Sequence, residues 1–172
     1  MSAGRGAGSS AAAAVAPLVA LAALLACAGC GGPSPEEQVR ALIAAGEQRA
    51  EAKDVRGLLD LVADDYADDA GRDRRELGAV LAFALQQYER VFLYVRIDRI
   101  AITGEGTAEA TLFVAIAGAE IADPSELPRL SADLGRVSLR LAVGGGKGFQ
   151  VAAADWEPAR LTDFLGPVEP RP

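Results

Sequence analysis

The chain has 172 residues, of which 24 are acidic and 17 are basic, and it contains no histidine. This length is typical of a single domain. Without histidine there can be no imidazole general base, no Ser-His-Asp or Cys-His triad and no His-containing zinc site. The formal net charge of −7 argues against a protein that binds nucleic acid, because neutralising phosphates needs a basic surface.

The first thirty residues have the pattern of a secretory targeting segment. Arg5 is the only charged side chain among residues 1–10, and residues 11–28 carry no charge. A basic start, an apolar stretch and a small-residue exit are typical of a signal peptide. Because the apolar stretch is nearly as long as the ~20 residues that cross a bilayer, an uncleaved signal anchor is the alternative.

Both cysteines lie at the end of this segment, in the stretch LLACAGC at 24–30. The stretch resembles the lipobox of bacterial lipoproteins, in which an aliphatic residue precedes an acylated cysteine by three positions. The resemblance implies cleavage before the cysteine and a membrane anchor of acyl chains on Cys30 or Cys27. Leu24 favours Cys27, whereas the Gly-Gly-Pro-Ser tether favours Cys30, and the choice stays open. A disulfide between them would close a small loop and stabilise little.

The same resemblance implies a location in the bacterial cell envelope. Neither Ala28 nor Gly31, which follow the two cysteines, is the aspartate that these lipoproteins often use for inner-membrane retention. We therefore expect the periplasmic face of the outer membrane rather than the inner membrane. The expected organisation is a signal peptide at 1–29, a tether at 30–34, a domain at 35–158 and a loose tail at 159–172.

Three amphipathic helices are predicted in the first half of the domain, because apolar residues recur there at intervals of three and four. Ser34, Pro35 and Glu37 form a helix start with a capping box, and Asp54 and Asp73 are N-cap residues for the helices that follow. The predicted helices cover residues 35–53, 55–63 and 73–88.

Beyond residue 91 the apolar period changes to two, which predicts β-strands. A phase shift of the apolar positions at Asp98 and Arg99 predicts a β-bulge that bends the first strand. The segment 122–133 holds Pro124 and Pro128 and is interpreted as an insertion between strands. Helices followed by an antiparallel sheet make an α+β fold. The predicted strands cover residues 91–102, 108–116, 137–143 and 149–157.

The segment from Glu36 to Trp156 resembles the nuclear-transport-factor-2-like (SnoaL-like) superfamily. Two linked helices are followed by Asp-Asp-Tyr at 64–66, a third helix and bent hairpins, and FQVAAADW at 149–156 is similar to the superfamily's closing strand. The resemblance implies a cone, with three N-terminal helices packed on a strongly curved antiparallel sheet. Its members include steroid isomerases, polyketide cyclases, dehydratases, transport adaptors and domains without an assigned activity, so the resemblance leaves the function open.

Catalytic members of this superfamily place a carboxylate, a tyrosine or a histidine inside the cone. The sequence matches no motif of a named enzyme branch, so the resemblance assigns no catalytic residue to this chain. Asp98, Tyr94 and Asp155 are candidates for proton transfer. The alternative is that Asp98 and Arg96 lie on a solvated face or pair across the sheet.

An apolar ligand pocket is a second expectation for the cone. Tyr88, Tyr94, Phe149 and Trp156 could line it, or they could be ordinary core residues.

Two further patterns are not interpreted as sites. Counted from Asp65, the third and sixth positions of the acidic stretch are Ala67 and Ala70, which fails the pattern of a calcium loop. The stretch GGGKG at 144–148 lacks the Ser/Thr and the helix of a phosphate loop and is interpreted as a hairpin turn. We therefore expect no metal and no cofactor.

Together these patterns predict a lipid-anchored, non-enzymatic envelope protein that binds a small apolar ligand or a partner protein. The expected protein partner is a second copy of the chain or another envelope protein. The alternative is an isomerase-like or dehydratase-like enzyme that uses a pocket carboxylate and a tyrosine.

Overall fold

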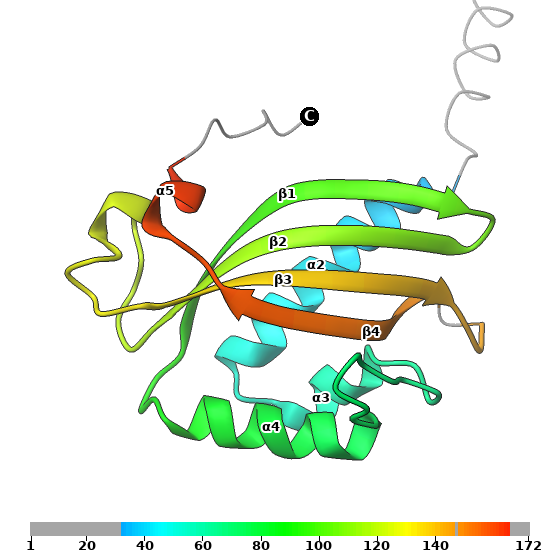
Figure 1. Cartoon of the computed structure of the whole chain (residues 1–172), viewed down its shortest axis with the longest axis horizontal. Helices are drawn as coiled ribbons and strands as arrows, with labels where there is room; N and C mark the ends of the chain where they lie inside the picture. The colour runs from blue at the N-terminus through cyan, green and yellow to red at the C-terminus, as the bar shows by residue number, and fades with distance from the viewer. Residues whose placement is uncertain (1–31, 147, 166–172) are drawn as a thin grey trace, which may run out of the picture. The chain divides into compact units, whose positions relative to one another are not determined.

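The computed structural model of the chain describes residues 32–146 and 148–165. The chain divides into two compact units, Met1–Ser34 and Pro35–Pro172, and the helices and strands described below belong to the second (Figure 1). The predicted signal peptide, Cys27 and Cys30 lie outside the described residues. Within the described ranges, no helix has both the length and the apolar character needed to cross a bilayer.

The three helices predicted from the apolar spacing are present, and two of their predicted caps are confirmed. The Asp54 side chain accepts a hydrogen bond from the Gly57 backbone N–H at 2.8 Å. Asp73 and Glu76 form a capping box, in which each side chain accepts from the other residue's backbone N–H. The helices are α2 (Pro35–Glu51), α3 (Val55–Asp60) and α4 (Arg74–Gln86).

The four strands form one antiparallel sheet in the order β1-β2-β3-β4 (Figure 1). The register between β1 and β2 shifts between Ile97 and Arg99, which confirms the predicted bulge at Asp98. A further shift in the β1–β2 register lies between Ile102 and Gly104, and the β3–β4 register shifts between Arg140 and Leu141. Bulges of this kind bend and twist a sheet. The strands are β1 (Phe92–Gly104), β2 (Thr107–Ala117), β3 (Asp133–Val143) and β4 (Phe149–Pro158).

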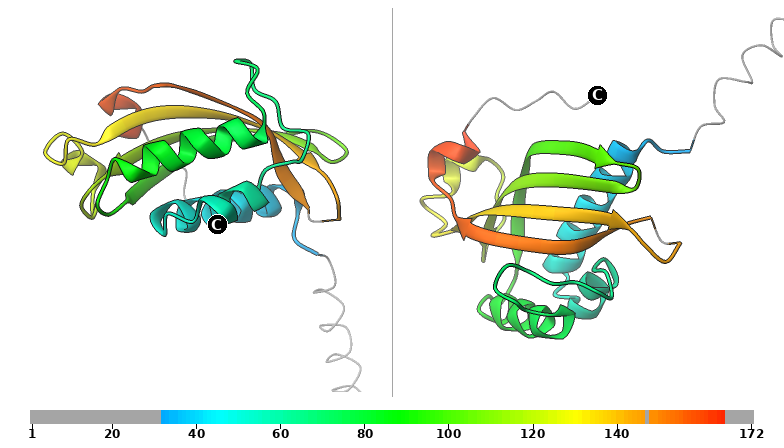
Figure 2. Two further views of the ribbon diagram at one scale, coloured as in Figure 1. Left: turned by 90° about the horizontal axis from the view of Figure 1, so that it is seen from below. Right: turned by 45° about the vertical axis from the view of Figure 1, so that its right-hand side comes forward.

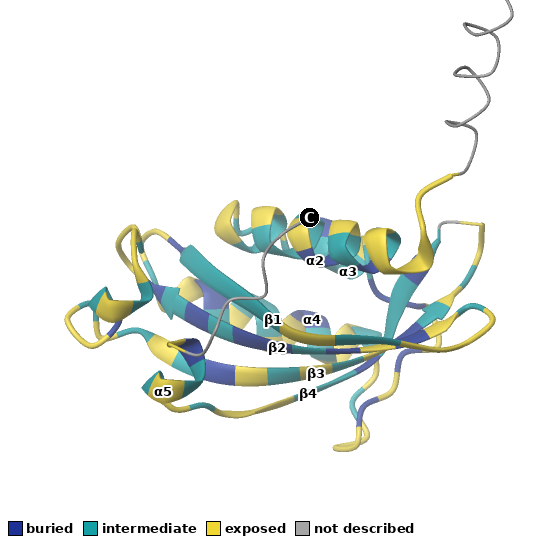
Figure 3. Cartoon of the chain, turned by 90° about the horizontal axis from the view of Figure 1, so that it is seen from above, coloured by how far each residue is buried: buried dark blue, intermediate teal, exposed yellow. Residues whose placement is uncertain are grey.

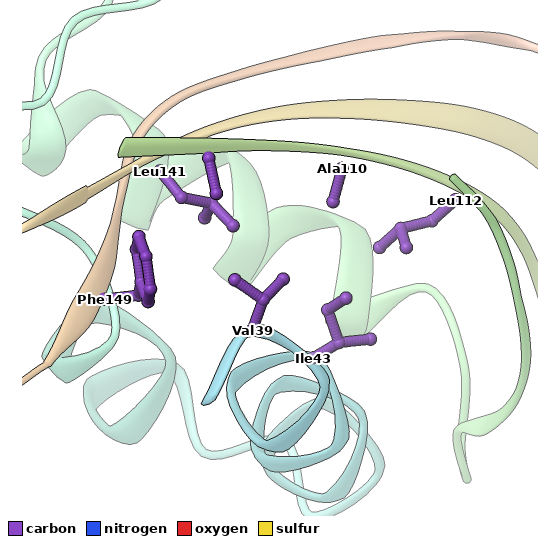
Figure 4. Packing of buried hydrophobic residues seen from close by; sticks show 7 residues of the cluster. Val39, Ile43, Ala110, Leu112, Leu141 and Phe149 are labelled. Atoms are coloured by element: carbon purple, nitrogen blue, oxygen red, sulfur yellow. The ribbon is translucent and has the colours of Figure 1, made fainter. Parts of the chain in front are cut away.

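The main core lies between α2 and the inner face of this curved sheet. The helix contacts both edge strands, β1 and β4, so the sheet curves around it. Val39 and Ile43 of α2 point at the sheet, where the small Ala110 of β2 lets the helix approach closely (Figure 4). Leu141 and Phe149 complete this layer. The predicted α+β fold, with N-terminal helices on a curved antiparallel sheet, is therefore confirmed.

A second, smaller core covers part of the outer face. Phe113 and Ala115 alternate along β2 with inward-facing residues, so they point away from α2. Residues of the 3₁₀-helix η1 (Pro124–Glu126) region and of α5 (Leu161–Phe164) pack on them. The burial of Phe164 differs from the loose tail predicted from residue 159, because its ring closes this second cluster. Figure 3 shows the buried positions that run along β2.

Helix α4 is packed differently from α2. Its closest packing is with α3, where the Arg74 guanidinium donates to the Leu59 carbonyl oxygen at 2.8 Å. Gly78 allows this approach, because a Cβ there would lie 3.0 Å from a Leu59 methyl group. Figure 2 shows α4 running along the unit as a rod separate from α2. The apolar stripe of α4 consequently borders a cavity rather than a filled core.

Candidate functional site

A cavity of about 930 Å³ lies between the inner face of the sheet and the helices α2, α3 and α4. Ligand pockets of proteins usually measure ~300–1,000 Å³ and have mainly apolar walls with a few polar groups. All four strands contribute apolar side chains to the walls. These are Leu93, Val95, Leu112, Val114, Ile116, Leu134, Val137, Leu139, Val151, Ala154, Trp156 and Pro158.

Helix α4 supplies the wall that faces the sheet. Side chains spaced three and four residues apart along and just after the helix line the cavity, namely Leu77, Val80, Leu81, Ala84, Leu85 and Tyr88. Val80 is 43% exposed and Phe83 is 69% exposed, although both border the cavity. Large apolar side chains left exposed at the edge of an apolar cavity are typical of a binding surface.

Tyr88 and Asp133 form the polar pair of the cavity wall. The Tyr88 hydroxyl donates a hydrogen bond to the Oδ2 atom of Asp133. Burial, followed by this hydrogen bond and the negative charge of Asp133, raises the pKa of Tyr88 to about 12. The Lys53 ammonium donates to the backbone carbonyl oxygens of Tyr88 and Glu89, which fixes the chain just beyond α4. Tyr88 is therefore a fixed, protonated phenol at neutral pH.

A second tyrosine, Tyr66, lies next to a buried carboxylate. Its hydroxyl is 3.4 Å from the Ala154 carbonyl oxygen and 3.5 Å from Oδ2 of Asp68. Asp68 accepts hydrogen bonds from the backbone N–H groups of Ala70 and Arg72 and from Nε of Arg72 at 2.6 Å. Burial acts to raise the pKa of Asp68, but these hydrogen bonds and the Arg72 charge hold it below its ordinary value. The Asp68 carboxylate is therefore a structural anchor of the loop.

The structure separates the residues that the sequence grouped as pocket candidates. Tyr88 and Trp156 line the cavity. Phe149 belongs to the core under α2. Tyr94 packs in the second core, with its ring centroid 6.3 Å from that of Phe164.

The catalytic candidates are separated in the same way. Asp155 borders the cavity. The pKa of Arg72 is raised mainly by the hydrogen bond and charge of Asp68, and that of Arg140 by those of Asp69, with a smaller contribution from the charge of Asp155. Asp98 lies at the bulge of β1, where its carboxylate pairs with the Arg96 guanidinium at 3.2 Å. Asp133, whose carboxylate accepts a hydrogen bond from Tyr88 in the cavity wall, was not singled out from the sequence.

Trp156 forms part of the cavity wall at the end of β4 and is 52% exposed. Its indole lies against Gly135 of β3, where a Cβ would overlap the ring. Gly135 therefore sets the position of the indole. Among the described residues, no group of three or more acidic or cysteine side chains is placed to hold a metal ion.

No family model matches the chain, and no curated protein matches it. Solved structures do match its fold. One is a "putative dehydratase from the NTF2-like family" of Streptomyces avermitilis, with 18% identity and a TM-score of 0.56 over 73% of this chain and 97% of that one. Another is a "putative scytalone dehydratase" of Novosphingobium aromaticivorans, with 11% identity and a TM-score of 0.56 over 72% and 83% of the two chains.

A third similar structure is Bd1075 of Bdellovibrio bacteriovorus, with 9% identity and a TM-score of 0.55 over 70% of this chain. The match spans only 40% of the length of that protein. At such low identities these likenesses concern the fold alone. They show that the described domain has a nuclear-transport-factor-2-like fold, which it shares with proteins named as dehydratases.

Proposed function

We propose that this domain binds a small apolar molecule in the cavity beneath α4, as a lipid-anchored and non-enzymatic protein of the bacterial cell envelope. The observation that carries the binding function is the cavity itself, with a volume of about 930 Å³ and apolar walls from four strands and three helices. Burial of an apolar ligand there would be favourable by ~25 cal/mol for each Å² removed from water.

The contacts of the buried Asp68 carboxylate support a binding role over a catalytic one. A general base inside such a cavity needs a carboxylate that can reach a substrate and accept its proton. Asp68 is instead held by two backbone N–H groups and a guanidinium, and it is not part of the cavity wall.

The anchor is proposed at Cys30 or Cys27, as the lipobox resemblance implies. Helix α2 begins at Pro35, beside the β3–β4 hairpin, where the Cβ position of Gly148 is 3.7 Å from Oε1 of Gln38. The Tyr88–Asp133 pair lies where β1 and β3 begin. This is the end of the strands opposite the β3–β4 hairpin (Figure 1). A tether of a few residues reaches ~3.5 Å for each residue. It would hold the hairpin end near the membrane and leave the Tyr88 end toward the aqueous side.

The binding function is tested by filling the cavity. Trp156 is the only tryptophan of the chain and lines the cavity, so its fluorescence reports occupancy. We expect 1-decanol to change this fluorescence in the wild type and not in the variant Ala84→Phe, whose new ring would occupy the cavity. Ala79→Phe is the matched control, because Ala79 is exposed on the same helix and does not line the cavity. Equal changes of Trp156 fluorescence on titration of the two variants with 1-decanol would contradict the proposal.

The anchor is tested separately by mass spectrometry of the chain produced in a bacterium with outer and inner membranes. We expect a mature N-terminus at one of the two cysteines that carries acyl chains, and loss of the acyl chains in either Cys27→Ser or Cys30→Ser. An intact N-terminal segment with unmodified cysteines would contradict the anchor and leave the cavity proposal standing.

The alternative is a dehydratase-like or isomerase-like enzyme. It is favoured by one observation, the Tyr88 hydroxyl that donates to the Asp133 carboxylate in the cavity wall. In such an enzyme Asp133 would accept a proton from a substrate carbon. Dehydration of a β-hydroxy ketone, followed by the absorbance of the enone product, distinguishes the two functions. Turnover that is lost in Asp133→Asn would favour the enzyme, and a chain that binds 1-decanol without turnover would favour binding alone.

A further inference from the structure

We propose that the cavity selects apolar molecules whose polar end is a hydrogen-bond donor, such as a hydroxyl or ammonium group, and that it discriminates against carboxylates. This inference rests on the proposed binding function and adds to it the chemical class of the ligand.

The first argument is the charge of the cavity wall. The acidic residues of the wall are Glu47, Asp133 and Asp155. Of the described residues that line the cavity, Arg72 is the only basic one. Its guanidinium is paired with the buried Asp68 carboxylate, with Nε and Oδ2 2.6 Å apart. The wall therefore has an excess of negative charge and offers a carboxylate ligand no uncommitted cation.

The second argument is the direction of the hydrogen bond between Tyr88 and Asp133. The single hydroxyl proton of Tyr88 is donated to the Asp133 carboxylate. What this pair still offers to a ligand is lone pairs, on the phenol oxygen and on the carboxylate oxygens. A ligand group that contacts the pair must supply its own proton. A ligand carboxylate supplies none and would place a second negative charge beside Asp133, which is unfavourable.

The third argument concerns the basic residues near this end of the cavity. The Lys53 ammonium donates to the backbone carbonyl oxygens of Tyr88 and Glu89. The Arg90 guanidinium lies over the Phe92 ring, 5.7 Å from its centroid. Neither Lys53 nor Arg90 lines the cavity. Both positive charges therefore make their contacts outside the cavity.

The exposure of Asp133 fits a ligand with one polar end. Asp133 is exposed, whereas the apolar side chains from β2 and β3 lie deeper in the wall. An amphiphilic molecule could place its apolar body against the sheet and its donor group at Asp133 without burying an unpaired polar group.

The test compares three probes of equal chain length, decylamine, 1-decanol and decanoate, each at neutral pH and below its solubility limit or micelle-forming concentration. The dissociation constants are obtained from Trp156 fluorescence of the full chain. We expect decanoate to bind at least about tenfold more weakly than the other two probes. In the variant Asp133→Asn, the affinity for decanoate should approach the affinity for 1-decanol. The affinity for decylamine should decrease.

The control variant is Asp64→Asn, which removes the same charge from a side chain that is 98% exposed and outside the cavity. It should keep the selectivity of the wild type. Equal affinity for the three probes, or a selectivity that Asp133→Asn leaves unchanged, would overturn the inference while the binding function stands. If none of the probes changes the Trp156 fluorescence, the binding function itself fails, and the selectivity fails with it.

Discussion

The hydroxyl of Tyr88 and the carboxylate of Asp133 join the end of α4 to the start of β3, although 45 residues separate them in the chain. At its other end α4 packs on α3, and this hydrogen bond connects the segment just after the helix to the sheet. The same pair is a hydrogen-bonded polar group in a mainly apolar wall. This contact thus helps to position α4 beside the cavity and, in the proposed binding function, selects the ligand groups that are received there.

The raised pKa of Tyr88 predicts an alkaline transition. In the unfolded chain the phenol ionises near its ordinary value of 10.0, whereas the folded domain holds the proton up to about 12. The contribution of Tyr88 to stability is therefore complete below pH 10 and is lost as the pH rises toward 12. An ultraviolet difference titration should show a tyrosine component near pH 12 that disappears in Tyr88→Phe. Its persistence in Tyr88→Phe would assign the component to another tyrosine.

The Asp68–Arg72 ion pair predicts an acid transition of opposite sign. Because the pKa of Asp68 is lowered by folding, its contribution to stability is present above the ordinary pKa of 3.8 and is lost as the pH falls through the lower folded value. The free energy of unfolding of the wild type should therefore fall more steeply below about pH 4 than that of Asp68→Asn. Asp64→Asn, at an exposed carboxylate, should behave like the wild type. Parallel acid profiles for all three proteins would contradict this role.

Local rules account for the part of the fold that the sequence predicted. Asp54 and Asp73 are caps because a short acidic side chain can reach the free N–H groups of the first helical turn. The bulge at Asp98 follows from a phase shift of apolar residues within a single strand. Each of these features depends on residues within one turn or one strand, so no knowledge of the tertiary arrangement was needed.

The composition of the cavity wall depends on contacts between residues far apart in the chain. It was therefore only partly predictable from the sequence. Strand alternation already placed Tyr94 on the face opposite Leu93 and Val95, which line the cavity. That signal could have removed Tyr94 from the pocket candidates. The contact of Tyr88 with Asp133 depends on the register of β3 and on the position of α4, and no local pattern encodes either. The burial of Phe164 was not predicted, because a four-residue helix is too short to show an apolar periodicity in the sequence.

The contact between Gly135 and Trp156 predicts a variant that alters the site more than the stability. A methyl group in Gly135→Ala would overlap the indole and force it to rotate. Because Trp156 is half exposed, it can move toward solvent, and we expect a change of less than about 1 kcal/mol in the free energy of unfolding. The emission of Trp156 should shift to longer wavelength, and 1-decanol should bind more weakly. An unchanged spectrum would show that the indole position does not depend on Gly135.

The second core predicts that the segment after β4 is required for stability. Phe164 is 1% exposed, and its ring centroid lies 5.9 Å from that of Phe113 and 6.3 Å from that of Tyr94. Phe164→Ala leaves a cavity between two aromatic rings and should lower the free energy of unfolding by about 3–5 kcal/mol. Leu165→Ala is the matched control, because Leu165 is 53% exposed and its loss should cost less than about 0.5 kcal/mol. Urea unfolding measures both values from the transition midpoint. Equal midpoints for the two variants would mean that the segment from residue 159 is as loosely attached as its sequence suggests.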